Sequence, residues 1–399
     1  MLSAQTIAIV KATVPVLEQY GEQITSHFYG IMLRDYPQVR GYFNQTHQAA
    51  GTQARALANG VLAYATNIDR LEALKDALPV IVQKHAALDI RPEHYPIVGT
   101  CLLQAIREVL GEAATDDIIN AWAEAYQQLA DILIGAEEQV YRDNAARTGG
   151  WRGQRTFRVA RKQPESSVIT SFYLEPVDGG ELMAFQPGQY LTLVMTVNGE
   201  PLRRSYSLSD APGQSYYRIS VKRETNGVAS NYLHDQVNEG DVLEVLAPCG
   251  EFVLREAERP LVLVTGGVGI TPAISMLNAV APSGRRIEFV HAALNGSVHA
   301  FRAHVERMSL QYPNVKPHFV YNEAHADDQP HARGFVTAET LAARLPQGAD
   351  VDLYFLGPKP FMQSVYRSAQ QLGIPAGQVH YEFFGPKEEL AAPAAEAAA

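Results

Sequence analysis

Two short stretches of the sequence combine residue types that can bind a cofactor. The run VIVQKHAALD, residues 80–89, places His85 at helical spacing from apolar residues, and an imidazole on an apolar face needs a partner. The run VLVTGGVGITP places Gly266, Gly267 and Gly269 between a buried strand and a helix, where backbone N–H groups can approach a phosphate. A dinucleotide suits such a turn, and a tight strand-to-helix turn without a ligand is the alternative.

A third set of residues suits a flavin and its diphosphate. The neighbouring strand-like runs FQPGQYLTL and LRRSYSLSD carry Tyr190, Arg204 and Tyr206. The Arg204 guanidinium can pair with a diphosphate, and the two tyrosine rings can pack on a planar ring. The run NGVASNYLHD adds Gly227 and Ser230 where a helix would begin. Aromatic residues in a barrel are usually core or surface strand formers, so each tyrosine alone is weak evidence for a flavin site.

The elements that must hold these residues change in kind along the chain. Residues 1–147 show helical apolar spacing almost throughout and end near the glycine-rich run RTGGWRGQ. Residues 155–258 alternate apolar and polar in short runs broken by turn residues, which is typical of an antiparallel sheet or barrel. From residue 259, buried strands alternate with helical stretches, which indicates a parallel α/β sheet. The predicted helical stretches are 271–281, 299–312, 337–345 and 360–373, the first opening near Thr271.

We therefore predict a multidomain chain with an all-α domain, an antiparallel β-barrel domain and an α/β domain with a parallel sheet. The predicted bounds are 1–147, 148–258 and 259–387, followed by an Ala-rich tail, 388–399, with no predicted fold. The formal charge of −10 argues against attraction to nucleic acid or to an anionic membrane. Cys101 and Cys249 form no CxxC pair, and no signal sequence is recognised, so we expect a cytoplasmic protein.

Five motifs in the second and third domains resemble the ferredoxin–NADP reductase superfamily in kind and in order. They are FQPGQY, RRSYSLS, GGVGITP, LGPKPFM and HYEFFGP, and the resemblance covers residues 155–387. The resemblance implies FAD held by Tyr190, Arg204, Ser205, Tyr206, Ser207, Phe383, Phe384, Gly385 and Pro386, with Phe384 against the flavin ring. It implies NADH or NADPH held by Gly266, Gly267, Val268, Gly269, Ile270 and Thr271. Relatives often carry cysteine where this chain has Leu356 and Phe383, so no thiol role near the nicotinamide is implied.

The helical domain resembles a globin in HFYGIMLRDYPQVRGYFNQTHQ, TQARAL, VQKHAAL and a long last helix. The order of globin and reductase resembles flavohemoglobin over residues 1–387. By this resemblance, His85 is the proximal iron ligand and Tyr29 faces oxygen on the distal side. The resemblance also implies that the heme pocket is lined by Phe43, Gln53 and Leu57. It implies that Lys84 and Glu382 tune electron transfer. Because no CxxCH motif is present, we expect heme b, held without a covalent bond.

Glu137 supports the assignment of His85. It lies in helical register with Tyr126, Ala130 and Leu133, so its carboxylate sits near an apolar stripe and needs a donor. The resemblance supplies Tyr95, and a chain His85–Tyr95–Glu137 would make the imidazole more basic. The alternative is a solvated glutamate on a frayed last turn of helix.

The resemblance implies a nitric oxide dioxygenase with Tyr29, Tyr95 and Glu137 as catalytic residues. NAD(P)H would reduce FAD, FAD would reduce heme, and reduced heme with oxygen would convert nitric oxide to nitrate. Two other functions stay open: an oxygen carrier or sensor with a built-in reductase, and a flavin reductase with another electron acceptor. We expect nitric oxide and molecular oxygen as substrates, no nucleic acid, no stable membrane association and a monomer. The residues do not distinguish NADH from NADPH.

Overall fold

The computed structural model describes residues 2–44, 51–385 and 390. The chain forms two compact units. The first comprises residues 1–154, 192–204 and 249–251, and the second comprises residues 155–191, 205–248 and 252–399. Among the described residues, no helix is long and apolar enough to cross a membrane.

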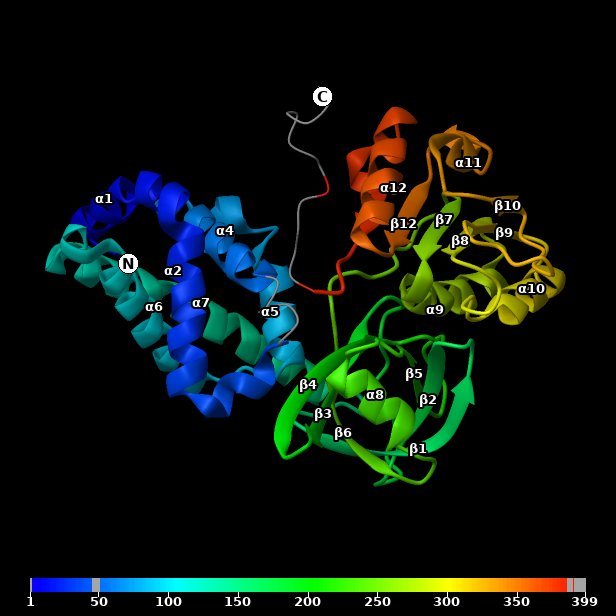
Figure 1. The fold of residues 1–399 in the computed structure, drawn as a ribbon, viewed down its shortest axis with the longest axis horizontal. Coiled ribbons are helices and arrows are strands. Elements are labelled where there is room, and N and C mark those ends of the chain that lie inside the picture. The colour runs from blue at the N-terminus through cyan, green and yellow to red at the C-terminus, as the bar shows by residue number, and fades with distance from the viewer. Residues whose placement is uncertain (1, 45–50, 386–389, 391–399) are drawn as a thin grey trace. The chain divides into compact units, whose positions relative to one another are not determined.

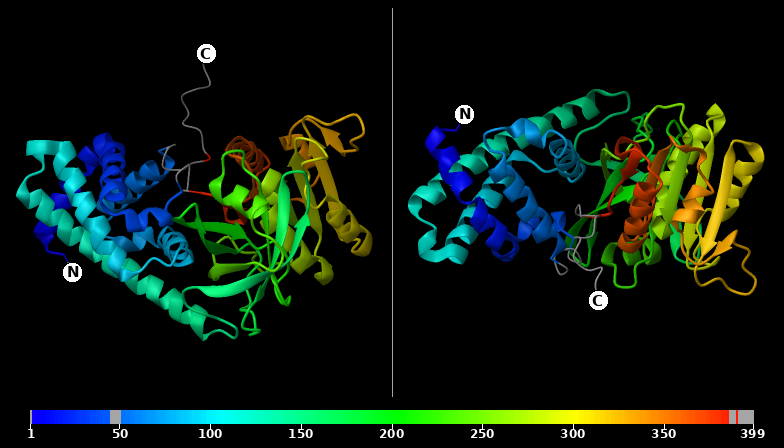
Figure 2. Two further views of the ribbon diagram at one scale, coloured as in Figure 1. Left: turned by 60° about the horizontal axis from the view of Figure 1, so that its bottom comes forward. Right: turned by 90° about the horizontal axis from the view of Figure 1, so that it is seen from above.

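The described residues up to 146 form helices. They are α1 (Ala4–Ala12), α2 (Val14–Asp35), α4 (Thr52–Thr66), α5 (Leu78–Ala87), α6 (Tyr95–Leu110) and α7 (Asp116–Ala146), joined by the 3-10 turns η1 (Pro37–Tyr42), η2 (Leu71–Leu74), η3 (Pro92–His94) and η4 (Gly111–Ala113). Ser3 caps α1 by accepting from the Thr6 N–H at 3.0 Å. Thr115 caps α7, whose first turn is acidic and so suits the positive end of the helix dipole. Figure 2 shows α7 as the long helix that runs along this part of the chain.

The next part of the chain folds as a six-stranded antiparallel sheet with one helix. Its elements are β1 (Arg155–Pro164), β2 (Ile169–Pro176), β3 (Tyr190–Val197), β4 (Glu200–Ser207), β5 (Tyr217–Lys222), β6 (Val242–Cys249) and α8 (Val228–Asp235). The strand order is β4-β3-β6-β1-β2-β5, and a bridge between Leu208 and Ile219 joins the end of β4 to β5. The two outer strands therefore meet, which closes the sheet into the predicted barrel.

The last part is a parallel sheet of order β10-β9-β8-β7-β12-β13. Its strands are β7 (Leu261–Gly266), β8 (Ile287–Ala293), β9 (Val315–Tyr321), β10 (Ala332–Arg333), β12 (Asp352–Leu356) and β13 (Val379–Tyr381). Its helices are α9 (Ile270–Val280), α10 (Arg302–Gln311), α11 (Ala338–Ala342) and α12 (Lys359–Gln371), with β11 (Pro346–Ala349) and the turns η5 (Gly267–Gly269), η6 (Ala281–Ser283) and η7 (Ala376–Gln378). This parallel sheet confirms the predicted fold class.

Helices cover both faces of the parallel sheet (Figure 1). Along β7, Leu261 and Leu263 pack in the cluster that contains α9 and α10 residues, whereas Val262 and Val264 pack in the cluster that contains α11 and α12 residues. Alternate residues of a strand point to opposite faces, so a strand buried on both sides is apolar at every position. The predicted helix over 299–312 begins instead at Arg302, because Phe301 before it has a left-handed φ of 62°.

Candidate functional site

His85 lies in the last turn of α5 and is held by a carboxylate from α7. Its Nδ1 is 2.7 Å from Oε1 of Glu137, and the Tyr95 hydroxyl donates to the same oxygen at 2.5 Å. His85 Nδ1 also lies 3.2 Å from the Tyr95 hydroxyl, so the three predicted residues are in mutual contact, and the carboxylate, only 2% exposed, is bonded directly to both others. Because Glu137 accepts, Nδ1 carries the proton, and Nε2 keeps a lone pair, which is the form of the imidazole that can bind a metal. Burial raises the pKa of Tyr95, so its hydroxyl stays a donor.

Two further tyrosines of α7 hold the segment between His85 and Tyr95. The Tyr126 hydroxyl donates to the Tyr95 carbonyl at 2.6 Å, and the Tyr141 hydroxyl donates to the Ile90 carbonyl at 2.7 Å. Sequence reasoning missed both bonds. The signal was available in part, because helical spacing places these tyrosines on the same face of α7 as Glu137.

Helix α5 packs on the protein core through one face and carries His85 on another. Ile81, one turn before His85, is 39% exposed, whereas Val82 and Ala86 face the core. Because Ile81 and His85 are four residues apart, they share one face of α5, at the helical spacing that the sequence predicts. Lys84 is half-buried on the same helix.

The residues expected on the distal side come from α2, α4 and the turn between them. Tyr29 on α2 is buried, and its side chain hydrogen-bonds that of Gln53 on α4. The rings of Tyr29 and Phe43 meet edge to face, with centroids 5.6 Å apart, and Leu57 packs on the same core. Burial raises the pKa of Tyr29, so its hydroxyl keeps a proton to donate.

The two motifs expected to bind flavin are joined by their backbones. Tyr190 begins β3, and the Leu208 N–H donates to the Gln189 carbonyl at 2.9 Å, which links FQPGQY to RRSYSLS. On β4, Arg204 and Tyr206 are half-buried. Ser207 is buried, whereas Ser205 is exposed.

Ser230 on α8 uses its hydroxyl inside its own turn. The hydroxyl accepts from the Glu224 N–H at 3.1 Å and donates to the Gly227 carbonyl at 3.2 Å. Gly227 allows this turn, because a Cβ there would lie 2.3 Å from the Ser230 oxygen. These contacts shape the start of α8, where helix N–H groups are available to an acidic group.

The glycine-rich turn connects β7 to α9 as the sequence predicts. Gly267 has a left-handed φ of 53°, and a Cβ on Gly269 would lie 2.5 Å from the Leu356 carbonyl oxygen. A Cβ on Gly266 would lie 3.2 Å from the ring of Phe361. The Thr271 hydroxyl donates to the Val268 carbonyl at 3.0 Å. The turn therefore needs glycine for close packing, and α9 starts at Ile270, one residue before the predicted start at Thr271.

The FFGP motif follows β13. Phe383 packs on the core between the sheet and α12, whereas Phe384 is 49% exposed and presents an aromatic face. The Gly385 N–H donates to the Phe383 carbonyl at 2.8 Å, and Glu382 is half-buried. Pro386, also expected at the flavin, lies outside the described residues.

Comparison with known proteins follows the three parts of the fold. Residues 26–133 match the Globin family, residues 156–254 the oxidoreductase FAD-binding domain and residues 263–367 the oxidoreductase NAD-binding domain. The chain is 58% identical to a flavohemoprotein of Pseudomonas aeruginosa over 98% of this chain and 100% of that protein. It is 49% identical to a flavohemoprotein of Deinococcus radiodurans over 98% of this chain and 99% of that protein. The chain belongs to the flavohemoprotein family.

Solved structures agree with this assignment. A flavohemoglobin of Malassezia yamatoensis with bound FAD and heme is 26% identical, with a TM-score of 0.85 over 96% of this chain and 100% of that one. The flavohem-like FAD/NAD-binding domain of a nitric oxide dioxygenase from Vibrio cholerae is 37% identical, with a TM-score of 0.55 over 59% of this chain and 100% of that one. The chain is accordingly an oxidoreductase whose cofactors are heme, FAD and a nicotinamide dinucleotide.

The side chains described above fit these cofactors. An imidazole whose Nδ1–H is held by Glu137 offers the single nitrogen that a heme iron takes from a globin. A glycine turn at the start of α9 fits a diphosphate, and the half-buried Arg204 beside Tyr206 fits a flavin nucleotide.

Proposed function

We propose that this chain is a nitric oxide dioxygenase, which uses NAD(P)H and molecular oxygen to convert nitric oxide to nitrate. Each nitrate formed from one nitric oxide and one O2 takes up one electron, so the hydride of one NAD(P)H supports two conversions. When bound, FAD divides the hydride into single electrons, and heme iron supplies the redox chemistry with oxygen.

The observation that carries this proposal is the contact between His85 and Glu137. A buried carboxylate that accepts from Nδ1 gives the imidazole partial imidazolate character, and an electron-rich ligand favours oxygen activation over oxygen storage. The second bond, from Tyr95, keeps the carboxylate oriented toward the ring. We assign Glu137 and Tyr95 to this proximal role.

Tyr29 supports the same reaction from the distal side. A buried hydroxyl that keeps its proton can donate to a partly anionic oxygen ligand and hold it for attack. Gln53 orients that hydroxyl, and the edge of Phe43 limits the motion of its ring. From the family resemblance, we assign Lys84 and Glu382 to the tuning of electron transfer.

Replacement of His85 tests the proposal. In His85→Ala, we expect loss of the Soret band and collapse of nitric oxide consumption, while NAD(P)H oxidation with ferricyanide persists, because hydride transfer needs only the flavin and nucleotide sites. The matched control is His27→Ala, which removes an exposed α2 histidine paired with Glu108 and should leave all three measurements unchanged.

The same measurements separate the other functions. A wild-type chain that binds heme and oxygen but consumes nitric oxide far below its ferricyanide rate is a carrier or sensor. A wild-type chain without a Soret band after heme supply is a flavin reductase with another acceptor. Full heme content and nitric oxide consumption in His85→Ala would refute the ligand assignment.

A further inference from the structure

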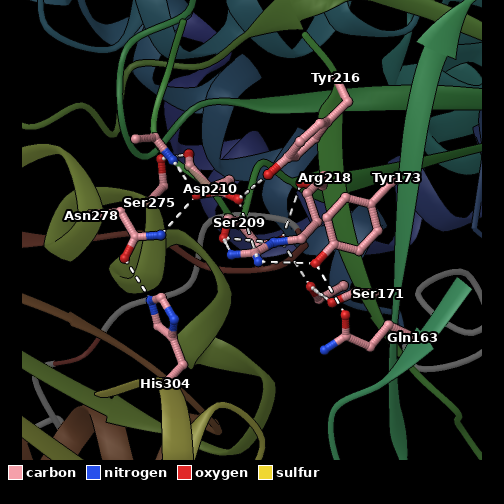
Figure 3. A network of polar contacts seen from close by, with 12 residues as sticks. Gln163, Ser171, Tyr173, Ser209, Asp210, Tyr216, Arg218, Ser275, Asn278 and His304 are labelled. Atoms are coloured by element: carbon pink, nitrogen blue, oxygen red, sulfur yellow. Dashed lines mark hydrogen bonds and ion pairs between the residues drawn. The ribbon is translucent and has the colours of Figure 1, made fainter. Parts of the chain in front are cut away.

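A polar network joins the end of the flavin motif to the helix that begins at the nucleotide turn (Figure 3). Asp210 follows RRSYSLS directly. Asn278 on α9 donates from Nδ2 to Oδ1 of Asp210 at 2.8 Å, and the Ser275 hydroxyl on α9 donates to the Asp210 carbonyl at 2.6 Å. One residue of the barrel thus receives two hydrogen bonds from one face of α9.

Asp210 is itself fixed to the barrel. Its Oδ2 accepts from the Tyr216 hydroxyl at 3.0 Å and lies 3.4 Å from Nη1 of Arg218. Arg218, only 7% exposed, donates from Nε to the Ser209 carbonyl at 3.1 Å. The Ser209 N–H donates back to the Arg218 carbonyl at 2.8 Å, next to the bridge that closes the barrel. The carboxylate is therefore held by Arg218 of β5 and by Tyr216, the residue before that strand.

Asn278 is fixed from the other side by α10. Nε2 of His304 is 2.7 Å from Oδ1 of Asn278. Because the Asn278 amide must point Nδ2 at the Asp210 carboxylate, Oδ1 is an acceptor and Nε2 of His304 carries the proton. Burial lowers the pKa of His304 to about 4, so the ring is neutral at physiological pH and keeps this single arrangement.

A second contact brings the other flavin motif to the same helix. Gly188 in FQPGQY approaches α9 so closely that a Cβ there would lie 2.8 Å from Cε of Met276. Both barrel motifs therefore contact residues 275–278 of α9. The glycine turn expected to bind the nucleotide, η5, directly precedes this helix. A helix transmits position along its axis with little bending, so the turn moves with Ser275 and Asn278.

We propose that Asp210, Ser275 and Asn278 are positioning residues for hydride transfer, which set the separation between the flavin ring and the nicotinamide. The inference rests on the proposed reduction of FAD by NAD(P)H. It adds three residues that are not among those assigned above to FAD or to the nucleotide. Hydride transfer is steeply sensitive to alignment, and a misplacement of about 1 Å can cost on the order of 100-fold in rate.

The first test removes the contacts to α9 one at a time in the holoenzyme. We expect Asn278→Ala and Ser275→Ala to slow flavin reduction at saturating NADH or NADPH by about 10-fold or more. FAD content and the apparent Kd of the nucleotide should stay within about two-fold, because the binding residues are intact. Rates come from anaerobic rapid mixing that follows flavin absorbance.

Matched controls on the same domain separate positioning from general loss of polar contacts. Asn314→Ala removes an amide that donates to the carbonyls of Ala281 and Arg285, and Ser283→Ala removes a hydroxyl that donates to the Val280 carbonyl. Neither side chain reaches the barrel through these bonds, so we expect an unchanged limiting rate. Hydrogen exchange provides a readout independent of activity, and it should rise in residues 207–211 and 270–280 only in the two α9 variants.

A swap of the two groups tests the pairing itself. Asn278→Asp alone brings two carboxylates together and should slow flavin reduction as strongly as Asn278→Ala. The double variant Asp210→Asn with Asn278→Asp restores an amide opposite a carboxylate, and the new amide oxygen still faces Arg218. We expect it to recover at least half of the lost rate on a logarithmic scale.

Three outcomes overturn the inference. The first is an unchanged limiting rate of flavin reduction in folded, FAD-loaded Asn278→Ala and Ser275→Ala. The second is a higher nucleotide Kd in these variants with an unchanged limiting rate. The third is no recovery of the rate in the double variant. Failure of the proposed function is distinguishable, because the wild-type FAD would then not be reduced by NADH or NADPH at all.

Discussion

Glu137 shows how one buried charge organises the residues around it. Transfer of a carboxylate out of water costs several kcal/mol unless donors replace the lost water. Here His85 and Tyr95 both donate to one carboxylate oxygen. The same reasoning applies to Asp210, where Asn278, Tyr216 and Arg218 supply the donors. In both places, the need to satisfy a carboxylate fixes the geometry of groups that carry chemistry.

Removal of the Tyr29 hydroxyl tests the distal hydrogen bond. Tyr29→Phe keeps the buried ring but loses the donor, and one buried hydrogen bond contributes about 1–3 kcal/mol. We therefore expect oxygen to dissociate about 5- to 150-fold faster in flash photolysis. As a control, Tyr64→Phe loses a bond to the Ala125 carbonyl and should cost stability without changing oxygen dissociation. Equal dissociation rates in wild type and Tyr29→Phe would remove Tyr29 from the distal site.

Arg204 provides a test of flavin retention. Arg204→Ala removes the charged partner expected at the diphosphate, so the protein should lose FAD on dialysis while heme content persists. The flavin-to-heme absorbance ratio measures this. Arg158→Ala is the matched control, because Arg158 is an exposed arginine of β1 that pairs with Glu175. Stoichiometric FAD in both variants after dialysis would exclude Arg204 from the diphosphate site.

At the scale of elements, the approach of α6 to α7 depends on one glycine. A Cβ on Gly99 would lie 2.6 Å from Cε1 of Tyr126, and Tyr126 is held in place by its bond to the Tyr95 carbonyl. Gly99 therefore places Tyr95, at the start of α6, within reach of Glu137. Packing overrides helix propensity here, since glycine in a helix interior is unfavourable by itself.

Gly99→Ala should destabilise the helical domain by about 1–3 kcal/mol, because overpacking outweighs the propensity gain of about 0.5–1 kcal/mol. Gly135→Ala on α7 is the control, since nothing lies within 4 Å of its Cβ, and it should stabilise by about 0.5–1 kcal/mol. Urea unfolding followed by far-UV circular dichroism measures both. A stabilised Gly99→Ala would show that the Tyr126 ring moves aside freely.

At the scale of the whole molecule, buried histidines make stability depend on pH. Burial lowers the pKa of His291 to about 3 and that of His304 to about 4, both below the unfolded value of 6.5. The unfolded chain therefore binds protons that the folded chain does not, once pH falls below 6.5. The stability they contribute is complete above pH 6.5. It is lost as pH falls from 6.5 toward the folded pKa values of about 3 for His291 and about 4 for His304.

His291→Asn isolates one of these groups. Each buried histidine contributes a slope of about 1.4 kcal/mol per pH unit well inside the window, so the variant should flatten the decline between pH 6 and pH 5 by about that amount. The amide oxygen can still accept from the Thr265 hydroxyl, which now lies 2.8 Å from Nδ1 of His291. Denaturant unfolding at several pH values measures the slope. The same slope in wild type and variant would contradict the lowered pKa of His291 in the folded chain.

The sequence by itself determined the local elements and the composition of each site. Helix α6 spans Tyr95–Leu110, a run whose apolar residues recur at helical spacing, and the glycine turn before α9 follows from the need for close backbone approach. The order of motifs also determined the family. These features depend on neighbours within a few residues, whose spacing along the chain sets their spacing in the helix or turn.

Only the tertiary structure decided which distant groups meet. The contacts of Glu137 with both His85 and Tyr95 depend on how α5 and α6 pack against α7, and a shift of one residue in either helix would break them. Asp210 meets Asn278 only because the barrel closes at Leu208 and α9 packs beside that closure. Such contacts join residues far apart in the chain, so the free energy of packing the whole core selects them, and no local pattern encodes them.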